Sequence, residues 1–419
     1  MTPKKHNRQY DLVVFGATGY TGVYIAEFIT NSLPTNLRWA IAGRSRSKLE
    51  KIALDLKALN PERLQPDVEI CGLNGSDLEA LARKTSILIT TVGPYAVSGE
   101  HAFKACAENG THYLDVTGET PWVARMIKKY ESTAQASGAL MIPQIGIDSC
   151  LPDVVTYTLA SLIRTELQAK TADVTVSVYR LNARPSGGTL ASALGLFDSF
   201  SVKELNQSLA PFALSPLPNP RPPIKQPSLF TRLTGLRSVP HLGLQTTFIA
   251  GRTDAGIVER TWGLFSLIPS RKQDFYGPRF TFAEYLKASG WLDGIVKHVG
   301  LAVAGMLLML LPPFRWLVKK LVTKPGDGPD KEAAKDEDID YRGVATPDLP
   351  GSSNKMAYCR AHYVGMTALF VTQAAMTLLE DDVELGPGIL TPACLGQGYI
   401  DRLETGGLKF ESRLLDSQA

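Results

Sequence analysis

Short apolar runs alternate with amphipathic stretches over the first 145 residues of the chain. Six runs have the length and composition of strands: Tyr10–Phe15, Arg38–Ala42, Val68–Cys71, Ile87–Val92, His112–Asp115 and Leu140–Ile142. Helical patterns separate them, ending near Thr30, covering Ser47–Ala58, and starting near Ser76, Gly99 and Pro121. Strands that alternate with helices of this length indicate right-handed βαβ units and a parallel sheet. We therefore predict an α/β fold, with a doubly wound parallel sheet formed by residues 1–150.

The rhythm changes after about Pro152. A helical pattern over Asp153–Arg164 leads to Asp173–Leu181, where apolar and polar residues alternate as in a strand. Pro211–Pro227 contains seven prolines and is expected to be a loop or an extended ribbon. Two further strands are predicted over Gln245–Ala250 and Gly256–Leu267. These patterns predict a second domain of the α+β type, which binds the substrate, over residues 151–322.

The most apolar part of this second domain is residues 295–318. Val299–Phe314 contains no charged residue and lies between Lys297 and Arg315. A helix that spans a membrane needs about 20 apolar residues, and the pair Pro312 and Pro313 interrupts this run. Three interpretations stay open. The segment is a helix or hairpin buried in the domain, an anchor on a membrane or lipid-droplet surface, or, least favoured, a transmembrane span.

The rest of the chain is more polar. Residues 323–354 are rich in Gly, Pro and Asp, which predicts a mobile acidic loop. Residues 355–419 are expected to form a C-terminal helix and a loop that return to the interface between the two domains.

Composition excludes several classes of protein. Hydrophobic residues make up 44% of the chain and charged residues 20%, which is typical of a globular protein. Lys and Arg number 44 and Asp and Glu 41, a balance that argues against nucleic acid as the main partner. The five cysteines form no C-x-x-C pair, so we expect neither a disulfide framework nor a metal site. Met1–Gln9 lacks the apolar core of a signal peptide. We expect a cytoplasmic protein, with association to a membrane or lipid droplet left open.

A glycine-rich turn directly after the first predicted strand is the clearest binding motif. It opens a predicted helix and consists of Gly16, Ala17, Thr18, Gly19, Tyr20, Thr21 and Gly22. Glycines at this place let the backbone approach a pyrophosphate, and the helix N-terminus offers free N–H groups to it. The turn therefore predicts nucleotide binding, with a purely structural turn as the alternative.

The end of the second predicted strand indicates which nucleotide is bound. Gly43 is followed by Arg44, where NAD-binding proteins usually have an acid that bonds the ribose 2′-hydroxyl. An arginine accommodates a 2′-phosphate instead, and Ser45 and Lys48 would add a hydrogen bond and a second positive charge. We predict NADP(H) as the cofactor. The alternative is that these residues form a solvated basic helix start.

A third motif, Thr90–Tyr95, follows the fourth predicted strand. Ligands of doubly wound sheets bind outside the carboxyl ends of the strands. Val92, Gly93 and Pro94 would therefore lie beside the cofactor, and Tyr95 near its nicotinamide. A simple tight turn before the next helix is the alternative.

These motifs resemble the saccharopine dehydrogenase-like oxidoreductases, a family that includes trans-acting enoyl reductases. The resemblance is dense over residues 10–155 and looser beyond, and it covers most of the chain. It rests on Gly16–Gly22, Ala42–Arg44, Thr90–Tyr95, His112–Glu119 and Ile145–Asp153, then on Arg184–Thr189 and Gly388–Ala393. The resemblance implies a Rossmann domain joined to a mixed α+β domain, an NADP-type cofactor and lipid-like substrates.

Other catalytic patterns are missing from the sequence. None of the fourteen tyrosines has a lysine four positions later, and there is no G-x-S-x-G or H-E-x-x-H motif. Hydride transfer by the cofactor is therefore the expected chemistry, with the protein supplying position and a proton. Tyr95 is the first candidate for that proton and Asp148 the second. For Asp115, Glu119 and Asp148, helix capping and turn formation are the alternative roles.

Together these observations predict an NADPH-dependent oxidoreductase that reduces a hydrophobic acyl or polyketide-type substrate, with an enoyl double bond as the leading choice. The substrate would be a small molecule or bound to a carrier. Two alternatives stay open: reduction of a C=N or C=O bond in a small metabolite, and a non-catalytic NADP-binding protein docked on a membrane or lipid droplet. A homodimer is also left open.

Overall fold

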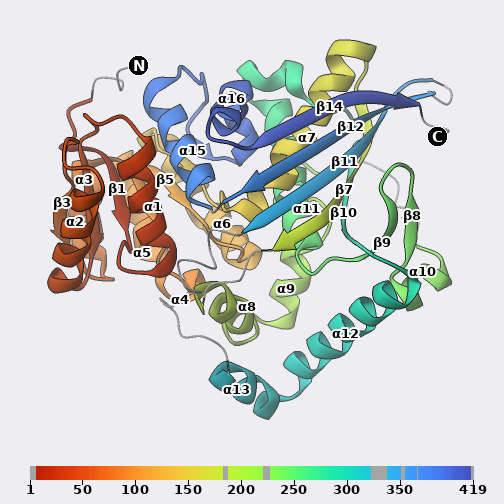
Figure 1. Cartoon of the computed structure of the whole chain (residues 1–419), viewed down its shortest axis with the longest axis horizontal. Coiled ribbons are helices and arrows are strands. Elements are labelled where there is room, and N and C mark those ends of the chain that lie inside the picture. Colours follow the sequence, from red (N-terminus) through yellow and green to blue (C-terminus); the bar gives the residue numbers. More distant parts are fainter. Residues whose placement is uncertain are drawn as a thin grey trace.

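Two seven-stranded sheets organise the chain in the computed structural model, sheet A on the left of Figure 1 and sheet B on the right. The structure describes residues 6–182, 187–219, 227–321, 337–350, 354–365 and 367–416. Parts of three predicted segments lie outside these ranges: residues 184–186 of the motif Arg184–Thr189, residues 220–226 of the proline-rich segment, and residues 323–336 and 351–353 of the predicted acidic loop.

Sheet A is entirely parallel, with the order β13-β6-β5-β4-β1-β2-β3. Its strands are β1 (Tyr10–Phe15), β2 (Trp39–Gly43), β3 (Asp67–Ile70), β4 (Thr85–Thr90), β5 (His112–Asp115), β6 (Leu140–Ile142) and β13 (Gly388–Ile389). From β1 the strand order runs outward in two directions, to β2 and β3 on one side and to β4, β5 and β6 on the other. The carboxyl ends of β1 and β4 therefore meet at the point where nucleotides bind in sheets of this kind.

Sheet A is buried on both faces by helices. Leu12 and Val14 of β1 contribute to one hydrophobic core, whereas Val13 and Phe15 contribute to another, because successive side chains of a strand point to opposite faces. The helices between the strands are α1 (Tyr20–Ser32), α2 (Arg46–Leu59), α3 (Gly75–Lys84), α4 (Tyr95–Ser98), α5 (Glu100–Asn109) and α6 (Thr120–Ser137). The predicted α/β fold is confirmed.

Sheet B is mixed, with the order β14-β12-β11-β7-β10-β9-β8. Its strands are β7 (Thr171–Asn182), β8 (Arg237–Val239), β9 (Gly243–Thr247), β10 (Thr281–Lys287), β11 (Asp338–Pro347), β12 (Lys355–Val364) and β14 (Lys409–Asp416). Only the β7–β10 pair is parallel. Helices α7 (Ile147–Leu167) and α11 (Gly251–Leu267) cover one of its faces (Figure 1).

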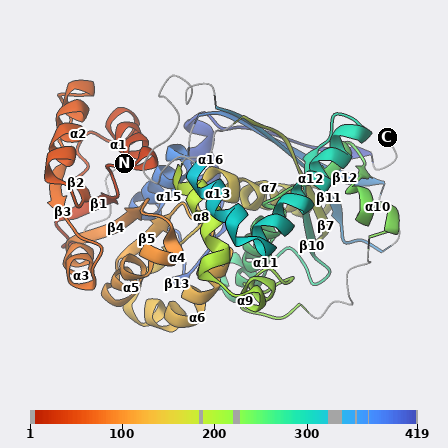
Figure 2. The same ribbon diagram turned by 90° about the horizontal axis from the view of Figure 1, so that it is seen from below.

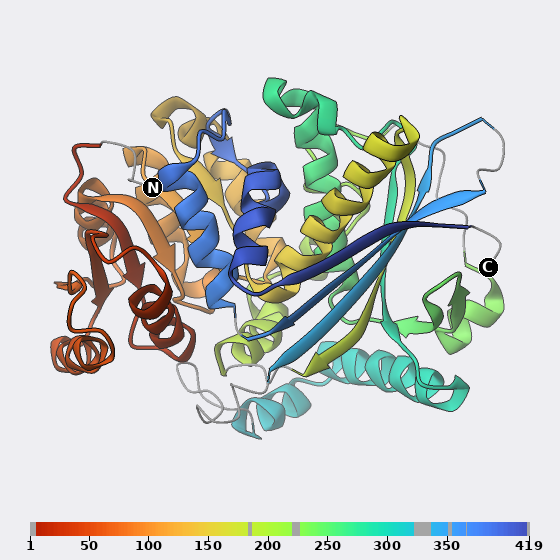
Figure 3. The same ribbon diagram turned by 45° about the horizontal axis from the view of Figure 1, so that its top comes forward.

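The remaining helices connect or extend the two sheets. They are α8 (Gly187–Ser199), α9 (Val202–Ser208), α10 (Leu229–Thr234), η1 (Pro269–Asp274), α12 (Trp291–Leu310), α13 (Pro312–Leu321), α15 (Ala368–Glu380), η2 (Pro392–Leu395) and α16 (Gln397–Thr405). Helix α15 packs beside α1 (Figure 3), and β13 pairs with β6. The last part of the chain thus contributes to both sheets, since β12 and β14 belong to sheet B. It is more than the helix and loop that the sequence suggests.

The strand predicted over Gly256–Leu267 is wrong, because this segment is the second half of α11. Every residue from Asp254 to Phe265 is buried. Because the helix is buried on all sides, its apolar residues do not mark a single face, and a short apolar run such as Trp262–Phe265 does not distinguish a helix from a buried strand.

The mobile loop predicted over residues 323–354 is also wrong for the part that the structure describes. Asp338–Pro347 is β11, which lies between β7 and β12 in sheet B. Its acidic residues have cationic partners on β11 itself and on the neighbouring strands β7 and β12. Asp338 pairs with Arg180, and Asp340 accepts hydrogen bonds from Arg342 and Arg360. Composition alone does not reveal such partners, so the segment looked like a solvated loop.

The apolar segment at residues 295–318 is not buried, so the first of its three interpretations is wrong. Helices α12 and α13 form an arm along the lower edge of the molecule in Figure 1. Trp291–Leu310 is long and apolar enough to cross a membrane, and only 6% of its most apolar 18-residue window is buried. The arm meets the body at α8 and α10 (Figure 2) and along β9.

Candidate nucleotide site and its neighbouring acids

The glycine-rich turn joins β1 to α1 at the carboxyl edge of sheet A. Gly16 has a φ of +89°, and a β-carbon there would lie 2.7 Å from Val92 Cγ2. A β-carbon at Gly22 would overlap the Gly16 carbonyl oxygen. These two glycines thus keep the turn closed against the end of β4.

The third glycine faces open space. The nearest heavy atom to a β-carbon at Gly19 would be the Gly16 carbonyl oxygen, 3.4 Å away. Gly19 caps α1 without a side-chain hydrogen bond, and the first turn of α1 has no acid. The first backbone N–H groups of α1, those of Tyr20, Thr21 and Gly22, therefore remain available to an anion. This cradle fits a pyrophosphate.

The predicted 2′-phosphate residues follow β2, the strand beside β1. Gly43 ends the strand, and a β-carbon there would lie 4.0 Å from the Thr18 hydroxyl of the glycine turn. Arg44 and Lys48 are exposed, and no hydrogen bond or ion pair joins either side chain to the part of the chain that the structure describes. Ser45 is the N-cap residue of α2 and bonds only the Ser47 hydroxyl, at 3.4 Å. The two cations and the hydroxyl thus fit a phosphate monoester.

The end of β4 completes this edge. The Thr91 hydroxyl donates a hydrogen bond to the Gly16 carbonyl at 3.2 Å, and the Thr91 amide donates to the Phe15 carbonyl at 3.0 Å. Val92, Gly93 and Pro94 follow, and a β-carbon at Gly93 would lie 3.6 Å from the Ser192 hydroxyl of α8. The structure therefore brings the three predicted motifs to one edge and adds α8 as its neighbour.

Tyr95 lies at this edge, but its hydroxyl is enclosed. The side chain is 4% exposed, and its hydroxyl donates a hydrogen bond to the Thr90 carbonyl at 2.9 Å. The ring packs on Trp122, and the Tyr95 and Ala96 amides donate to the Glu119 carboxylate. Burial raises the pKa of Tyr95 well above its ordinary value. These contacts describe a packing residue, so its role as proton donor stays a prediction without geometric support.

Asp115 forms a turn, which is the role that the sequence offers as the alternative to catalysis. It ends β5 and accepts hydrogen bonds from the amides of Thr117 and Gln144 and from the hydroxyl of Tyr113. Burial raises its pKa to about 7.

Asp148 is differently placed. It lies in the first turn of α7, which begins at Ile147, six residues before the predicted helix. A β-carbon at Gly146 would lie 3.2 Å from Asp148 Oδ1 and 3.6 Å from Val116 Cβ, just beyond the end of β5. Burial raises the pKa of Asp148, although its side chain keeps some exposure. Asp148 is therefore a partly exposed acid just beyond the end of β5.

Two acids behind Asp148 are not predicted as site residues from the sequence. Asp254 in α11 and Glu284 in β10 are buried, and their charges interact with Asp148. No spacing connects them in the sequence, and only the tertiary fold brings them together. Among the described residues no group of acids, cysteines and histidines has the arrangement of a metal site.

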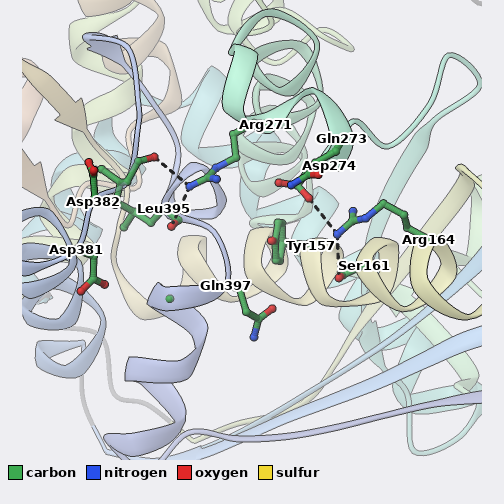
Figure 4. A pocket seen from close by; sticks show the side chains of 12 residues that line it. Tyr157, Ser161, Arg164, Arg271, Gln273, Asp274, Asp381, Asp382, Leu395 and Gln397 are labelled. Atoms are coloured by element: carbon green, nitrogen blue, oxygen red, sulfur yellow. Dashed lines mark hydrogen bonds and ion pairs between the residues drawn. The ribbon is translucent and has the colours of Figure 1, made fainter.

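A separate polar cavity of about 420 Å³ lies beside the other end of α7 (Figure 4). Both arginines of its wall are already bound to other groups of the protein. Arg164 pairs with Asp274 at 3.0 Å, and Arg271 donates to the Cys394 carbonyl at 2.9 Å. Ser161 in its wall is thirteen residues along α7 from Asp148, about 20 Å. This cavity is therefore distinct from the nucleotide edge.

Residues 12–142, which contain the cradle and the basic groups after β2, match the saccharopine dehydrogenase NADP binding domain. The fold and the site thus define an NADP-dependent oxidoreductase, and the predicted NADP(H) cofactor is confirmed.

The similarity extends beyond this domain. A Mycobacterium tuberculosis protein assigned provisionally as a trans-acting enoyl reductase is 31% identical over 98% of this chain and 99% of its own. A trans-acting enoyl reductase of Mycobacterium leprae is 28% identical over 97% and 98%. The saccharopine dehydrogenase-like oxidoreductase of Bos taurus is 29% identical over 96% and 97%. The chain belongs to the saccharopine dehydrogenase-like oxidoreductases, as its motifs predict.

A solved structure shares the fold at low sequence identity. The apo saccharopine dehydrogenase (L-Glu forming) of Saccharomyces cerevisiae covers 96% of this chain and 99% of its own, with a TM-score of 0.53 and 11% identity.

Proposed function

We propose that this oxidoreductase uses NADPH to reduce the double bond of a hydrophobic enoyl substrate. Two observations at the carboxyl edge of sheet A carry the proposal: the partly exposed acid Asp148 lies just beyond β5, and the apolar helix α8 lies beside Gly93 after β4. Ser192 is the only polar residue between Leu190 and Phe197 of α8. The relatives named as trans-acting enoyl reductases support the same chemistry.

Bound NADPH would supply a hydride to the β-carbon of the substrate. The chain has to hold the acyl group in place and protonate the α-carbon. Asp148 is suited to the second task because its raised pKa favours the protonated carboxyl, and its place beside Val116 faces the edge. The apolar side chains of α8 would hold the acyl chain and exclude water.

The arm formed by α12 and α13 supports delivery of this substrate from a lipid surface. Trp291 is 65% exposed and Leu292 76%, and Met306, Leu310 and Trp316 are exposed as well. Such an extended apolar surface is unusual on a monomer and marks an interaction site. Lys320 lies over the Trp316 ring at 3.7 Å, an arrangement that suits lipid headgroups.

The first half of α12 is hydrogen-bonded to β9. These contacts favour an arm that lies on a bilayer over one that crosses it. Thr246 donates a hydrogen bond to the Gly294 carbonyl at 2.7 Å, and the Thr247 hydroxyl bonds His298 Nδ1 at 2.8 Å. A straight span would have to break these contacts. Helix α13 contacts α8, and α8 contacts α4 at the carboxyl edge of sheet A. An acyl chain that leaves the lipid would therefore have a short path to this edge.

A second candidate is the reduction of a C=N bond, whose substrate or product carries a positive charge. The group of three acids around Asp148 favours it, since no described cation pairs with them. Both candidates use the same cofactor and the same edge, and they differ in the group that Asp148 meets.

The test is turnover by the purified protein with NADPH and matched substrates: long-chain and short-chain enoyl thioesters, the corresponding keto thioesters, and cyclic imines. We expect NADPH oxidation with long-chain enoyl thioesters and a kcat/KM that falls as the chain is shortened. Asp148→Asn should lower kcat by roughly 100-fold or more, as for other general acids, and leave NADPH binding unchanged. Oxidation of NADPH only with imines would replace the enoyl proposal by the second candidate.

A further inference from the structure

Two helices and a strand bring three carboxyl groups together beneath the nucleotide edge. Asp148 lies in the first turn of α7, Asp254 in the first turn of α11, and Glu284 in β10. A β-carbon at Gly251 would lie 2.8 Å from the Glu284 carbonyl oxygen, so the start of α11 is pressed against β10. Only Asp148 keeps appreciable exposure, and the other two carboxyls lie behind it.

The inner pair has no cationic partner among the described residues, and the side chain of Ser149 is the one neighbour that lowers the pKa of Asp254. Asp254 is fully buried and Glu284 is 5% exposed, and no described residue donates a well-formed hydrogen bond to any of their four carboxyl oxygens. A buried carboxylate without a cation or donors costs far more free energy than a buried neutral carboxyl. Two adjacent carboxyls avoid this cost by retaining a proton between them.

A tyrosine lies beside the inner pair of Asp254 and Glu284. Tyr341 in β11 is fully buried, and its hydroxyl has no hydrogen-bond partner among the described residues. Across β7, Tyr341 is opposite Val178 and Glu284 is opposite Val176, so both side chains lie on the face that α7 and α11 cover. Burial raises the pKa of this phenol, and the three acids close to it raise it further. An unpaired buried hydroxyl beside unpaired carboxyls indicates a place where protons are held and exchanged.

The pKa values of the acids agree with this geometry. Burial and the neighbouring Glu284 carboxyl raise the pKa of Asp254 well above its ordinary value. Burial raises the pKa of Glu284 to about 8. At neutral pH the pair therefore holds at least one proton. The charged and titratable groups that face it are Asp148 from α7 and Tyr341 from β11.

We propose that Asp254 and Glu284 form a proton reservoir that reloads Asp148 after each turnover. The inference rests on the proposed function, in which Asp148 protonates the substrate. In each cycle the C=C bond is reduced and NADPH is oxidised to NADP⁺. The β-carbon gains a hydride, and the α-carbon gains the proton of the Asp148 carboxyl. The Asp148 carboxylate then takes a proton from the inner pair, and the pair regains one from solvent. Asp148 is the catalytic residue, and Asp254 and Glu284 are positioning residues.

The first experiment needs no substrate. An acid whose pKa is raised on folding stabilises the native state less as pH rises from its unfolded pKa to its folded pKa. For Glu284 this window runs from about pH 4.5 to about pH 8. The Tm of the wild type should therefore fall more steeply across this range than that of Glu284→Gln. Glu411→Gln, the same change at an exposed site on β14, should leave the slope unchanged. Equal slopes for the wild type and Glu284→Gln would show that the pair holds no extra proton and would overturn the inference.

The second experiment follows kcat against pH with saturating NADPH and a long-chain enoyl thioester. In Glu284→Gln and Asp254→Asn we expect kcat to fall about tenfold and its alkaline limb to move to lower pH, while the KM for NADPH stays unchanged. A loss of kcat with an unmoved pH profile would mean that the pair is merely structural. Failure of every enoyl thioester to react would overturn the proposed function and the reservoir role together, whereas the Tm series would still report whether the pair retains a proton.

Discussion

At the scale of single residues, we expect selection between NADPH and NADH to depend on two basic side chains, Arg44 and Lys48, that have no partner within the described part of the chain. Arg44 and Lys48 are exposed and unpaired within the described part of the chain, whereas Arg46 between them faces Glu50. An arginine without a protein partner at the end of β2 keeps its guanidinium available for a phosphate.

We predict that Arg44→Asp weakens NADPH binding by about 1.5–3 kcal/mol, the value of a hydrogen bond to a charged group, and changes NADH binding little. Titration of nicotinamide fluorescence measures both affinities. Arg46→Asp is the matched control, since Arg46 lies two residues away and faces Glu50 at 3.6 Å. Equal losses for the two cofactors in Arg44→Asp would mean that Arg44 supports the fold and not the 2′-phosphate.

Tyr95 offers a second test at this scale. Tyr95→Phe removes the hydroxyl that donates to the Thr90 carbonyl, so we expect a loss of about 1–3 kcal/mol in the free energy of unfolding. Catalysis should be nearly unchanged, because that hydroxyl is enclosed. Urea unfolding and kcat can be measured on the same preparation. A drop in kcat comparable to that of Asp148→Asn, with stability intact, would restore Tyr95 as the proton donor.

At the scale of elements, the sequence predicts strands well where burial is uniform and the turns are local. β1, β5 and β6 have the predicted bounds, because apolar runs bounded by glycine turns leave little choice. The sequence predicts a strand where α11 forms and a loop where β11 forms, for opposite reasons. The all-round burial of α11 hides its helical period, and the acids of β11 are neutralised by arginines that are distant in sequence. Both errors arise from contacts that only the folded chain provides.

The arm of α12 and α13 gives the prediction for this scale. We expect the wild type to float with vesicles of phosphatidylcholine and phosphatidylserine in a density gradient. The double variant Leu292→Glu/Met306→Glu should remain in the dense fraction, because two charges would have to enter the apolar layer. Leu54→Glu, at an equally exposed leucine on α2, is the control and should float like the wild type. A wild type that stays with the dense fraction would contradict docking on lipid.

At the scale of the whole molecule, the two sheets contribute different groups to the candidate site. Sheet A supplies the nucleotide cradle from local motifs, which is why a sequence read alone predicts the cofactor. The face of sheet B and the starts of α7 and α11 supply the acids. Asp148, Asp254 and Glu284 are separated by 106 and 30 positions along the chain, and no spacing rule connects them. The sequence therefore offers Asp148 only as one candidate, and its neighbours Asp254 and Glu284 become visible only in three dimensions.

The most direct test of the account is the position of isotope labels in the reduced product. With a long-chain enoyl thioester, NADPH deuterated at the transferred position should label the β-carbon, and reaction in D₂O should label the α-carbon. In Asp148→Asn, label should still enter from the cofactor, at a much lower rate. Deuterium from the cofactor on a carbonyl carbon, or on no carbon of any enoyl substrate, would contradict the claim that this edge reduces a C=C bond.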